Sequence, residues 1–311
     1  MTNYPVPPGE PVGAQPELPA CARHSDRPTG LRCTRCDRPA CPECLREASV
    51  GYQCVDCVRE GQRTVRRVRT IAGAELSTKL VVTPALVGLN VLVFVATAVQ
   101  AQGIGTNYTS QLFHSWSLFP PSVANGEWWR LFTAGFLHFG PAHLALNMLA
   151  LWLLGRELEP VLGRLRYVGV YVMALLGGSA AAYTFGTICG ETAGASGAVF
   201  GLMGGLLAVL LRLKLSLTPA LTTIGINVLI SVLVPGISLL GHLGGLVVGG
   251  LLTAGMVYPP AKQRNAWQLS AVVAILVLLA IVVVTRNSAL IDQNIIVVPT
   301  GDGDTACLVR R

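Results

Sequence analysis

Seven apolar runs constrain this chain most strongly, because each comes close to the roughly 20 residues that cross a bilayer as a helix. Only 13% of the residues are charged, about half the share of a soluble domain. We therefore expect an all-α polytopic membrane protein. The runs cover residues 80–99, 141–155, 167–186, 196–211, 217–234, 238–258 and 267–285.

The basic residues predict the orientation of these helices. Thirteen of them lie in the linker of residues 59–79 or in the connections after the second, fourth and sixth runs, whereas the connections after the first, third and fifth runs carry only Arg130. By the positive-inside rule, the N-terminus is cytoplasmic and the tail from Asn287 is extracytoplasmic. We expect a multi-pass protein of the cell (plasma) membrane. Residues 1–20 are proline-rich without an apolar core, so they predict a disordered tail and no cleavable signal peptide.

A cysteine-rich module is expected over residues 21–58. Its eight candidate ligands, in four pairs of equal spacing, suffice for two tetrahedral zinc sites. So short a segment with little apolar content needs metal to fold. A disulfide cluster is the alternative, which a reducing cytoplasm disfavours. The ligands are Cys21, His24, Cys33, Cys36, Cys41, Cys44, Cys54 and Cys57.

The module resembles B-box-type zinc modules. That resemblance implies cross-braced pairing, in which the first and third pairs bind one ion, and the second and fourth the other. Sequential pairing stays open. Closed four-ligand sites leave no position for catalysis, so we expect the structural zinc sites to belong to a docking or regulatory domain. Whether it recognises a cytoplasmic protein partner or only stabilises the tail stays open.

The remaining boundaries follow from composition. A basic linker is expected at 59–79, a helical core at 80–258, a seventh helix at 259–286 and an extracytoplasmic tail at 287–311. Two further cysteines, Cys189 and Cys307, both fall on the outer side, and whether they are linked stays open.

The run at 196–211 begins with a Gly-x-Ser-Gly motif, Gly194 to Gly197. A serine flanked by glycines at a helix start has an uncrowded hydroxyl beside free backbone N–H groups. These features supply a nucleophile and an oxyanion site for acyl transfer.

Topology brings four polar side chains to a similar depth. The second, fourth and sixth helices run in one direction, and Ser196, His242, His143 and Asn147 lie in their first turns. Polar residues inside a membrane usually face a protein or water-filled interior. Helices four to six carry no Asp or Glu, so a Ser196–His242 dyad is the expected arrangement.

Two glycine ladders predict which helices touch, because small residues four apart let backbones approach closely. Taken singly, each polar residue has a structural reading: a membrane serine bonds its own helix, and a histidine or asparagine packs between helices. His138 is expected to support a loop, and His114 carries no signal. The ladders are Gly197, Gly201 and Gly205 in the fourth helix, and Gly241, Gly245 and Gly249 in the sixth.

Residues 80–258 resemble the rhomboid family of intramembrane serine proteases. The resemblance rests on several motifs together, and it implies a rhomboid-like six-helix bundle to which the seventh helix and zinc module are additions. The motifs are Glu127-Trp128-Trp129-Arg130-Leu131, Phe136-Leu137-His138, His143-x3-Asn147-Met148, Gly155-x3-Glu159, Gly163-x2-Arg166-Tyr167, Gly194-Ala195-Ser196-Gly197 and Gly241-His242-Leu243-Gly244-Gly245.

The resemblance also implies roles. Ser196 would be the nucleophile and His242 the general base, while His143, Asn147 and the Ser196 N–H would form the oxyanion hole. Phe200 takes an aromatic position that stacks on the histidine. Trp129 and Arg130 match a structural pair in the first outer loop.

We therefore expect a serine endopeptidase that cleaves transmembrane segments of membrane proteins near the outer face. Its partners would be these substrates and the lipid bilayer, with no nucleic acid and no catalytic cofactor. The rivals are a non-catalytic rhomboid-like protein that binds membrane clients, which would usually lack the serine or histidine, and a transporter or zinc sensor. The spans show no carboxylate chain of the kind that coupled transporters use.

Overall fold

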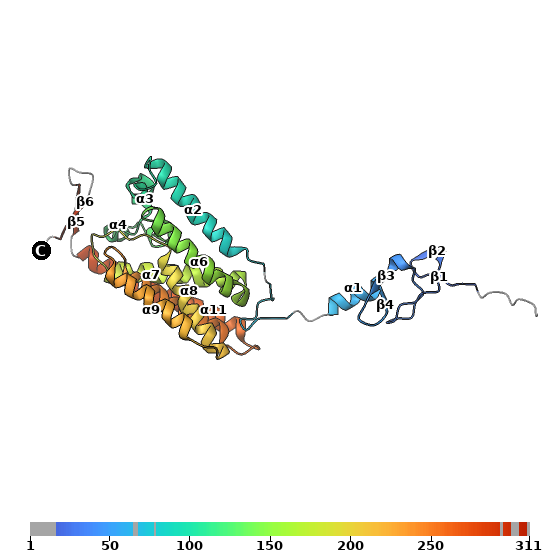
Figure 1. The fold of residues 1–311 in the computed structure, drawn as a ribbon. Helices are drawn as coiled ribbons and strands as arrows, with labels where there is room; N and C mark the ends of the chain where they lie inside the picture. The colour runs from blue at the N-terminus through green and yellow to red at the C-terminus, as the bar shows by residue number, and fades with distance from the viewer. Residues whose placement is uncertain (1–16, 65–67, 78, 293–294, 300–304, 310–311) are drawn as a thin grey trace, which may run out of the picture. The chain divides into compact units, whose positions relative to one another are not determined.

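The computed structural model describes residues 17–64, 68–77, 79–292, 295–299 and 305–309 (Figure 1). The chain divides into two compact units, with the boundary between Arg67 and Val68. Most of the expected proline-rich tail, residues 1–16, lies outside the described residues, as do Arg66 and Arg67 of the expected basic linker.

The N-terminal unit is a small module whose buried apolar residues are almost all cysteines. Beside six buried cysteines, only Ala40 and Leu45 join its core, with Cys36 half-buried against it. So little apolar surface cannot stabilise a fold by itself. Its elements are β1 (Ala20–Cys21), β2 (His24–Pro28), the 3-10 helix η1 (Pro42–Cys44), β3 (Leu45–Glu47), β4 (Tyr52–Cys54) and α1 (Val55–Thr64).

The second unit is a helical bundle with seven long helices among the described residues (Figure 1). They follow the seven apolar runs of the sequence. They are α2 (Val82–Gln100), α6 (Gly140–Leu162), α7 (Arg164–Phe185), α8 (Ser196–Leu213), α9 (Thr218–Leu233), α10 (Leu239–Val257) and α11 (Arg264–Asp292). Between α2 and α6 lie the short helices η2 (Asn107–Thr109), α3 (Gln111–Trp116), α4 (Pro120–Ala124), α5 (Arg130–Thr133) and η3 (Ala134–Phe136).

Fewer than seven of these helices meet the length and composition of a full membrane span. Five do so alone: α2, α7, α8, α10 and α11. A sixth span forms if α6 is taken together with residues 130–136, from which it is bent by 92°. Helix α9 has 16 residues, which at 1.5 Å per residue is about 24 Å and less than the roughly 30 Å of a hydrocarbon core.

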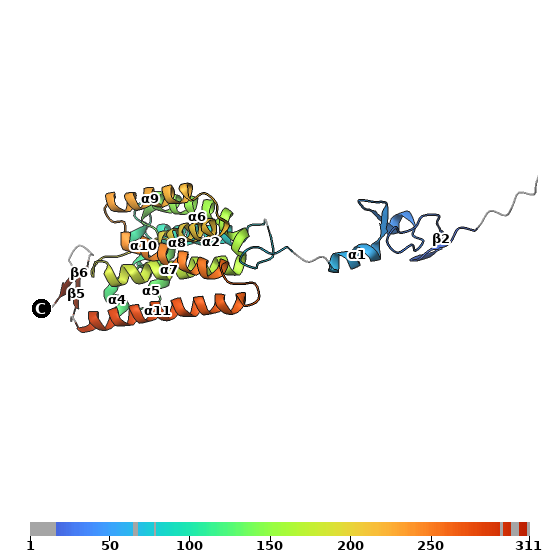
Figure 2. The same cartoon turned by 90° about the horizontal axis from the view of Figure 1, so that it is seen from below.

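Helices α7, α8 and α10 form the centre of the bundle. More than half of the α7 and α8 spans is buried, against 11% of α11. Figure 2 shows α9 and α11 on opposite sides of this central group. At the end of the chain, β5 (Ile295–Pro299) and β6 (Thr305–Val309) pair as an antiparallel hairpin.

A buried carboxylate joins the start of α2 to α6. Glu159, only 3% exposed, accepts the backbone N–H groups of Val81, Val82 and Thr83 at 2.8–2.9 Å, and also the Thr83 hydroxyl. The first N–H groups of a helix have no partner within it, and a negative charge there is favoured by the helix dipole. Glu159 therefore caps α2 from the neighbouring helix.

Gln268 of α11 joins several chain segments at one end of the bundle. Its amide nitrogen donates to the carbonyl oxygens of Ala72 and Met256, at 3.0 and 2.9 Å, and its oxygen accepts from Arg166. Met256 lies in the last turn of α10, where carbonyls lack a partner within the helix. Helix α11 is thus bonded into the bundle.

Several boundaries differ from those expected. Residues 59–64 of the expected linker continue α1, and Ala72, with no exposed surface, packs into the core of the helical unit. Helix α11 continues to Asp292, past the expected end at residue 286, and Asn287 accepts a bond from Tyr183 there. These tertiary contacts extend the ordered segments beyond what composition indicates.

Candidate functional site

The central helices α8 and α10 meet through their glycine ladders. A β-carbon at Gly245 would lie 2.0 Å from the carbonyl oxygen of Gly197, and one at Gly249 would lie 2.3 Å from that of Gly201. Both distances are far inside van der Waals contact, so a side chain at either position would push the helices apart. The glycines therefore set the separation of the two backbones, as small residues do in membrane helix pairs.

Helix α7 also packs at this junction. The sequence predicted contact only between the two ladder helices and did not include α7. A β-carbon at Gly178 would lie 2.7 Å from the Gly241 carbonyl oxygen and 3.1 Å from the Gly197 α-carbon. On the same helix, Ala174 fills the space that a side chain at Gly201 would need. The adjacent glycines at 177 and 178, inside an apolar run, were the sequence feature that could have indicated close packing of this helix.

Ser196 is the first residue of α8, and the turn before it depends on Gly194. Gly194 has φ +142°, a backbone conformation that residues with side chains rarely adopt, and its N–H donates to the Ala134 carbonyl at 2.9 Å. A β-carbon there would lie 2.9 Å from His143 Cε1 and 3.5 Å from Ser196 Oγ. The absence of a side chain at Gly194 thus lets His143 and Ser196 converge on one point.

His242 is 7% exposed and held on two sides in the first turns of α10. Phe200, one turn beyond Ser196 on α8, stacks on its ring, and its Nδ1 lies 2.7 Å from the hydroxyl of Ser231 on α9. Among the described residues, no hydrogen bond joins Ser196 to His242. Catalytic hydrogen bonds are often long without substrate and tighten when it binds.

His143 and Asn147 lie one turn apart on α6. The Phe139 N–H points at Nδ1 of His143 at 3.2 Å, so that nitrogen accepts, and a neutral ring carries its proton on Nε2. Nε2 is the atom that a β-carbon at Gly194 would approach to 3.1 Å. The amide nitrogen of Asn147 donates to the His143 carbonyl at 2.9 Å, which uses one of its two protons.

The turn that precedes α6 is fixed by Asn107, a residue that sequence reasoning missed. Its amide nitrogen donates to the His138 carbonyl at 2.8 Å, and its oxygen accepts from the Gly140 N–H at 3.0 Å. The fully buried His138 ring lies edge-on to that of His143, with centroids 5.1 Å apart. In the sequence, Asn107 lies between the first two apolar runs, where nothing distinguishes it.

Trp129 and Arg130 bond to backbone in the long connection between α2 and α6. The Arg130 guanidinium donates to the carbonyls of His114 and Ser117 and to the Glu127 carboxylate, and Trp129 donates to the Ser115 carbonyl. Arg130 is buried. Its contacts are those of a residue that holds the shape of this connection.

The N-terminal module brings its eight candidate ligands into two groups. Within each group the ligand atoms all lie within 4.8 Å of one another. The grouping is cross-braced, and the sequential alternative is not what the structure forms. One group is Cys21, His24, Cys41 and Cys44, and the other is Cys33, Cys36, Cys54 and Cys57.

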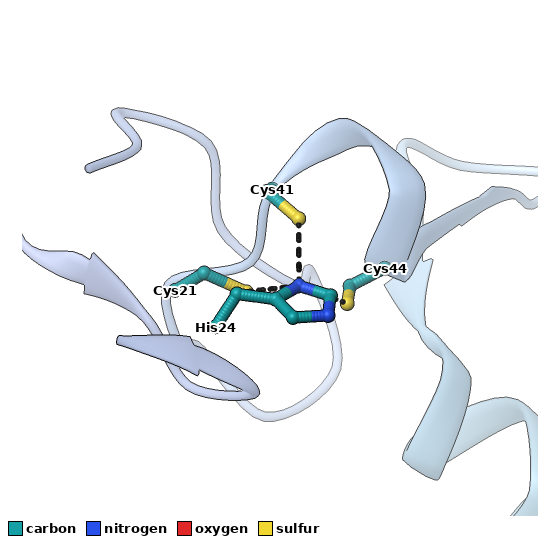
Figure 3. A group of neighbouring side chains, drawn as sticks. All are labelled: Cys21, His24, Cys41 and Cys44. Carbon is teal, nitrogen blue, oxygen red and sulfur yellow. Dashed lines mark hydrogen bonds between the residues drawn. The ribbon is translucent and has the colours of Figure 1, made fainter. Parts of the chain in front are cut away.

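The distances within these groups fit a tetrahedral metal site. At zinc–sulfur and zinc–nitrogen distances of about 2.3 and 2.05 Å, tetrahedral ligand atoms lie roughly 3.5–3.8 Å apart. Nδ1 of His24 lies 3.4 Å from the sulfurs of both Cys41 and Cys44 and 4.0 Å from that of Cys21 (Figure 3). In the second group, Cys36 and Cys54 have sulfurs 3.8 Å apart.

The thiols of each group perturb one another. Backbone N–H groups of Arg23 and Cys41 lower the pKa of Cys21 to about 6. Burial, followed by the neighbouring Cys41 and Cys21, raises the pKa of Cys44 to about 11. One ligand is thus easily deprotonated and another only with difficulty, so a cation is needed to stabilise the thiolates together.

Cys189 lies in the connection between α7 and α8 and is disulfide-bonded. The side chain of Cys307 lies outside the described residues.

The bundle and its buried polar cluster define a multi-pass helical membrane protein, preceded by a cysteine-rich module suited to zinc. Residues 125–259 match the family model of the rhomboid domain. The chain is 34% identical over 161 residues to rhomboid protease GluP of Bacillus subtilis (strain 168), a match that covers 49% of this chain and 31% of that protein. About half of this chain is thus similar to the rhomboid domain and to rhomboid proteases.

Two further relatives place the similarity in the same family. RHOMBOID-like protein 6, mitochondrial, of Arabidopsis thaliana is 35% identical over 152 residues, 47% of this chain and 48% of that protein. Rhomboid protease AarA of Providencia stuartii is 28% identical over 98 residues, 32% of this chain and 34% of that protein. The chain thus spans between about a third and a half of the length of these relatives.

Proposed function

We propose that this protein is an intramembrane serine endopeptidase in which Ser196 is the nucleophile and His242 the general base. The observation that carries the proposal is the packing of α8 against α10. Ser196 starts α8, and Phe200, four residues on, stacks on His242 with 4.1 Å between ring centroids. The names of the relatives, among them GluP and AarA, support proteolysis as the activity.

In the mechanism we propose, His242 takes the proton of Ser196 as its Oγ attacks the scissile carbonyl carbon. The carbonyl oxygen becomes an oxyanion, and the leaving amine takes the proton from His242. Water then attacks the acyl-enzyme while His242 takes a proton from it. His242 returns this proton to Oγ of Ser196, which regenerates the hydroxyl and releases the acid product. Both ring nitrogens of His242 have a role, because one accepts the proton while the other is held by Ser231.

We assign the oxyanion hole to His143, Asn147 and the Ser196 N–H. The Phe139 N–H occupies Nδ1 of His143, which leaves Nε2–H as a donor beside Gly194. Asn147 keeps a second amide proton after its bond to the His143 carbonyl. As the first residue of α8, Ser196 has an N–H without a partner in the helix. Preorganised donors of this kind stabilise developing negative charge.

The substrates we propose are transmembrane segments of other membrane proteins, cleaved near the outer face. An intact helix holds its carbonyls in hydrogen bonds and presents none to a nucleophile. The cleaved segment must therefore unwind locally, which favours small or helix-breaking residues at the site. We place the protein in the cell membrane. Its N-terminus would lie in the cytoplasm, as the basic residues in the connections indicate.

The test compares the parent with Ser196→Ala and His242→Ala on a model transmembrane substrate, and follows labelling by a fluorophosphonate. We expect both variants to lose cleavage and Ser196→Ala to lose the label. Cleavage that persists in Ser196→Ala would refute the assignment. A protein that binds clients without cleaving them would show no label in the parent.

For the N-terminal module we propose two structural zinc ions and a docking or regulatory role in the cytoplasm. Zinc bound to its eight ligands would supply folding energy that the small core lacks. Deleting residues 1–60 and measuring proteolysis of several substrates tests the role. A loss confined to some substrates would support docking, and full activity on all of them would contradict it.

A further inference from the structure

The hydroxyl of Ser231 lies 2.7 Å from Nδ1 of His242. The two residues come from different helices, α9 and α10, and both are nearly inaccessible, at 5% and 7% exposed. Polar side chains are costly inside a membrane bundle unless they are paired. This contact pairs the remaining ring nitrogen of the histidine that we propose as the base.

The direction of the bond follows from a second contact of Ser231. Its Oγ also lies 2.7 Å from the backbone carbonyl oxygen of Asn227, one turn earlier on α9. A carbonyl can only accept, so the single hydroxyl proton of Ser231 is donated there. Toward His242 the hydroxyl presents a lone pair, and Nδ1 must therefore carry a proton and donate it.

We propose that Ser231 is a positioning residue that holds His242 in its Nδ1–H tautomer, with the lone pair of Nε2 free to take the proton of Ser196. This inference rests on the proposed function. In soluble serine hydrolases a carboxylate holds the equivalent nitrogen of the base. Here a neutral hydroxyl, itself anchored to a backbone carbonyl, does so without placing a charge in an apolar bundle.

A serine that merely bonds its own helix would look different. Thr223, on the exposed side of α9, donates to the Pro219 carbonyl four residues earlier at 2.9 Å, and it has no histidine partner. Such back-bonding is common for hydroxyl residues in membrane helices. Ser231 makes the same bond and adds the contact with His242, so the second contact is what distinguishes it.

The position of α9 makes this contact consequential. Of its 16 residues only Ala220 and Ser231 are buried, and these two lie at opposite ends of the helix. Near the site, Ser231 is therefore the buried residue by which α9 touches the base. Displacement of this end of α9 would release the His242 ring, so the orientation of the base depends on where α9 lies.

The test uses two variants of nearly equal shape. Ser231→Thr keeps the hydroxyl, whereas Ser231→Val replaces it with a methyl group, and Thr223→Val is the control on the same helix. We expect Ser231→Val to lower kcat about tenfold relative to Ser231→Thr, near the upper end of what one neutral hydrogen bond provides, with KM little changed. Thr223→Val should cleave like the parent. Equal kcat for Ser231→Thr and Ser231→Val would overturn the proposal.

A spectroscopic measurement decides the tautomer without relying on activity. The protein has five histidines, so ¹⁵N-histidine labelling with His242→Ala for assignment isolates the ring signals of His242. At alkaline pH the parent should show a protonated Nδ1 and an unprotonated Nε2, and Ser231→Val a mixture of tautomers. An unprotonated Nδ1 in the parent would refute the role of Ser231. Cleavage that persists in Ser196→Ala would instead refute the proposed function and leave the tautomer measurement valid.

Discussion

The ring of Phe200 lies nearly parallel to the imidazole of His242, with centroids 4.1 Å apart and 15° between the planes. The contact covers one face of the imidazole, while Ser231 lies at its edge. Phe200 and Ser231 thus restrict the ring in two ways, one by packing and the other by a hydrogen bond. The resemblance to the rhomboid family implied this stacking, and the structure supplies its geometry.

We expect Phe200→Ala to lower kcat about 2- to 10-fold, the range that an aromatic pair contributes, because the imidazole loses the surface that orients it. Phe200→Tyr keeps the ring and should stay within about twofold of the parent. Cleavage of a model transmembrane substrate at saturation measures both. Unchanged kcat in Phe200→Ala would show that the stack does not orient the base.

Gly245→Ala should destabilise the bundle by about 1–3 kcal/mol, as overpacking does. The added methyl group would lie 2.0 Å from the Gly197 carbonyl oxygen. The matched control is Gly225→Ala on α9, where a β-carbon meets nothing within 4 Å. Thermal unfolding of the two variants in one detergent compares them, and equal midpoints would argue against close packing of α8 and α10.

Replacing the α2 cap should also cost stability. Glu159→Gln removes the charge that accepts from Val81, Val82 and Thr83, and we expect a loss of about 1.5–3 kcal/mol, the value of hydrogen bonds to a charged group. Glu157→Gln changes an exposed neighbour and should be neutral. The free energy of unfolding in mixed micelles checks both, and the cap assignment fails if the two variants match.

The metal content of the purified protein should fall in steps. The parent is expected to hold two zinc ions, and His24→Ala one, because only one group contains a histidine. His114→Ala lies outside both groups and should retain two. Elemental analysis by mass spectrometry measures the ratio. Full metal content in His24→Ala would exclude His24 as a ligand.

Metal affinity should decrease as the pH falls. Thiolates are the ligands, yet in the metal-free module burial and the neighbouring thiols raise the pKa of Cys44 to about 11, and Cys36 together with burial raises that of Cys57 to about 12. Binding must therefore release protons, which acid opposes. Competition with a colorimetric chelator at several pH values measures this dependence. An affinity that does not change with pH would contradict thiolate ligation.

The sequence predicted the helices well because apolar runs near bilayer length have few alternative folds. It also predicted that the two glycine ladders could meet, since their spacing is a property of the sequence. It did not identify Ser231 or Asn107, because a single serine or asparagine carries no pattern until tertiary packing gives it a partner. The burial of Ser231, which marks it out among the polar residues of α9, is visible only in the structure.

The three contacts of Gln268 bear on how this protein can be shortened. A chain cut before α11 would leave the carbonyls of Ala72 and Met256 without the donor that satisfies them, a costly state for backbone in an apolar environment. The segment that matches the rhomboid family model ends at residue 259, and the Met256 carbonyl near that end accepts from Gln268, which lies beyond it. We therefore expect a protein cut before α11 to be less stable than the parent, so a shortened version should retain this helix.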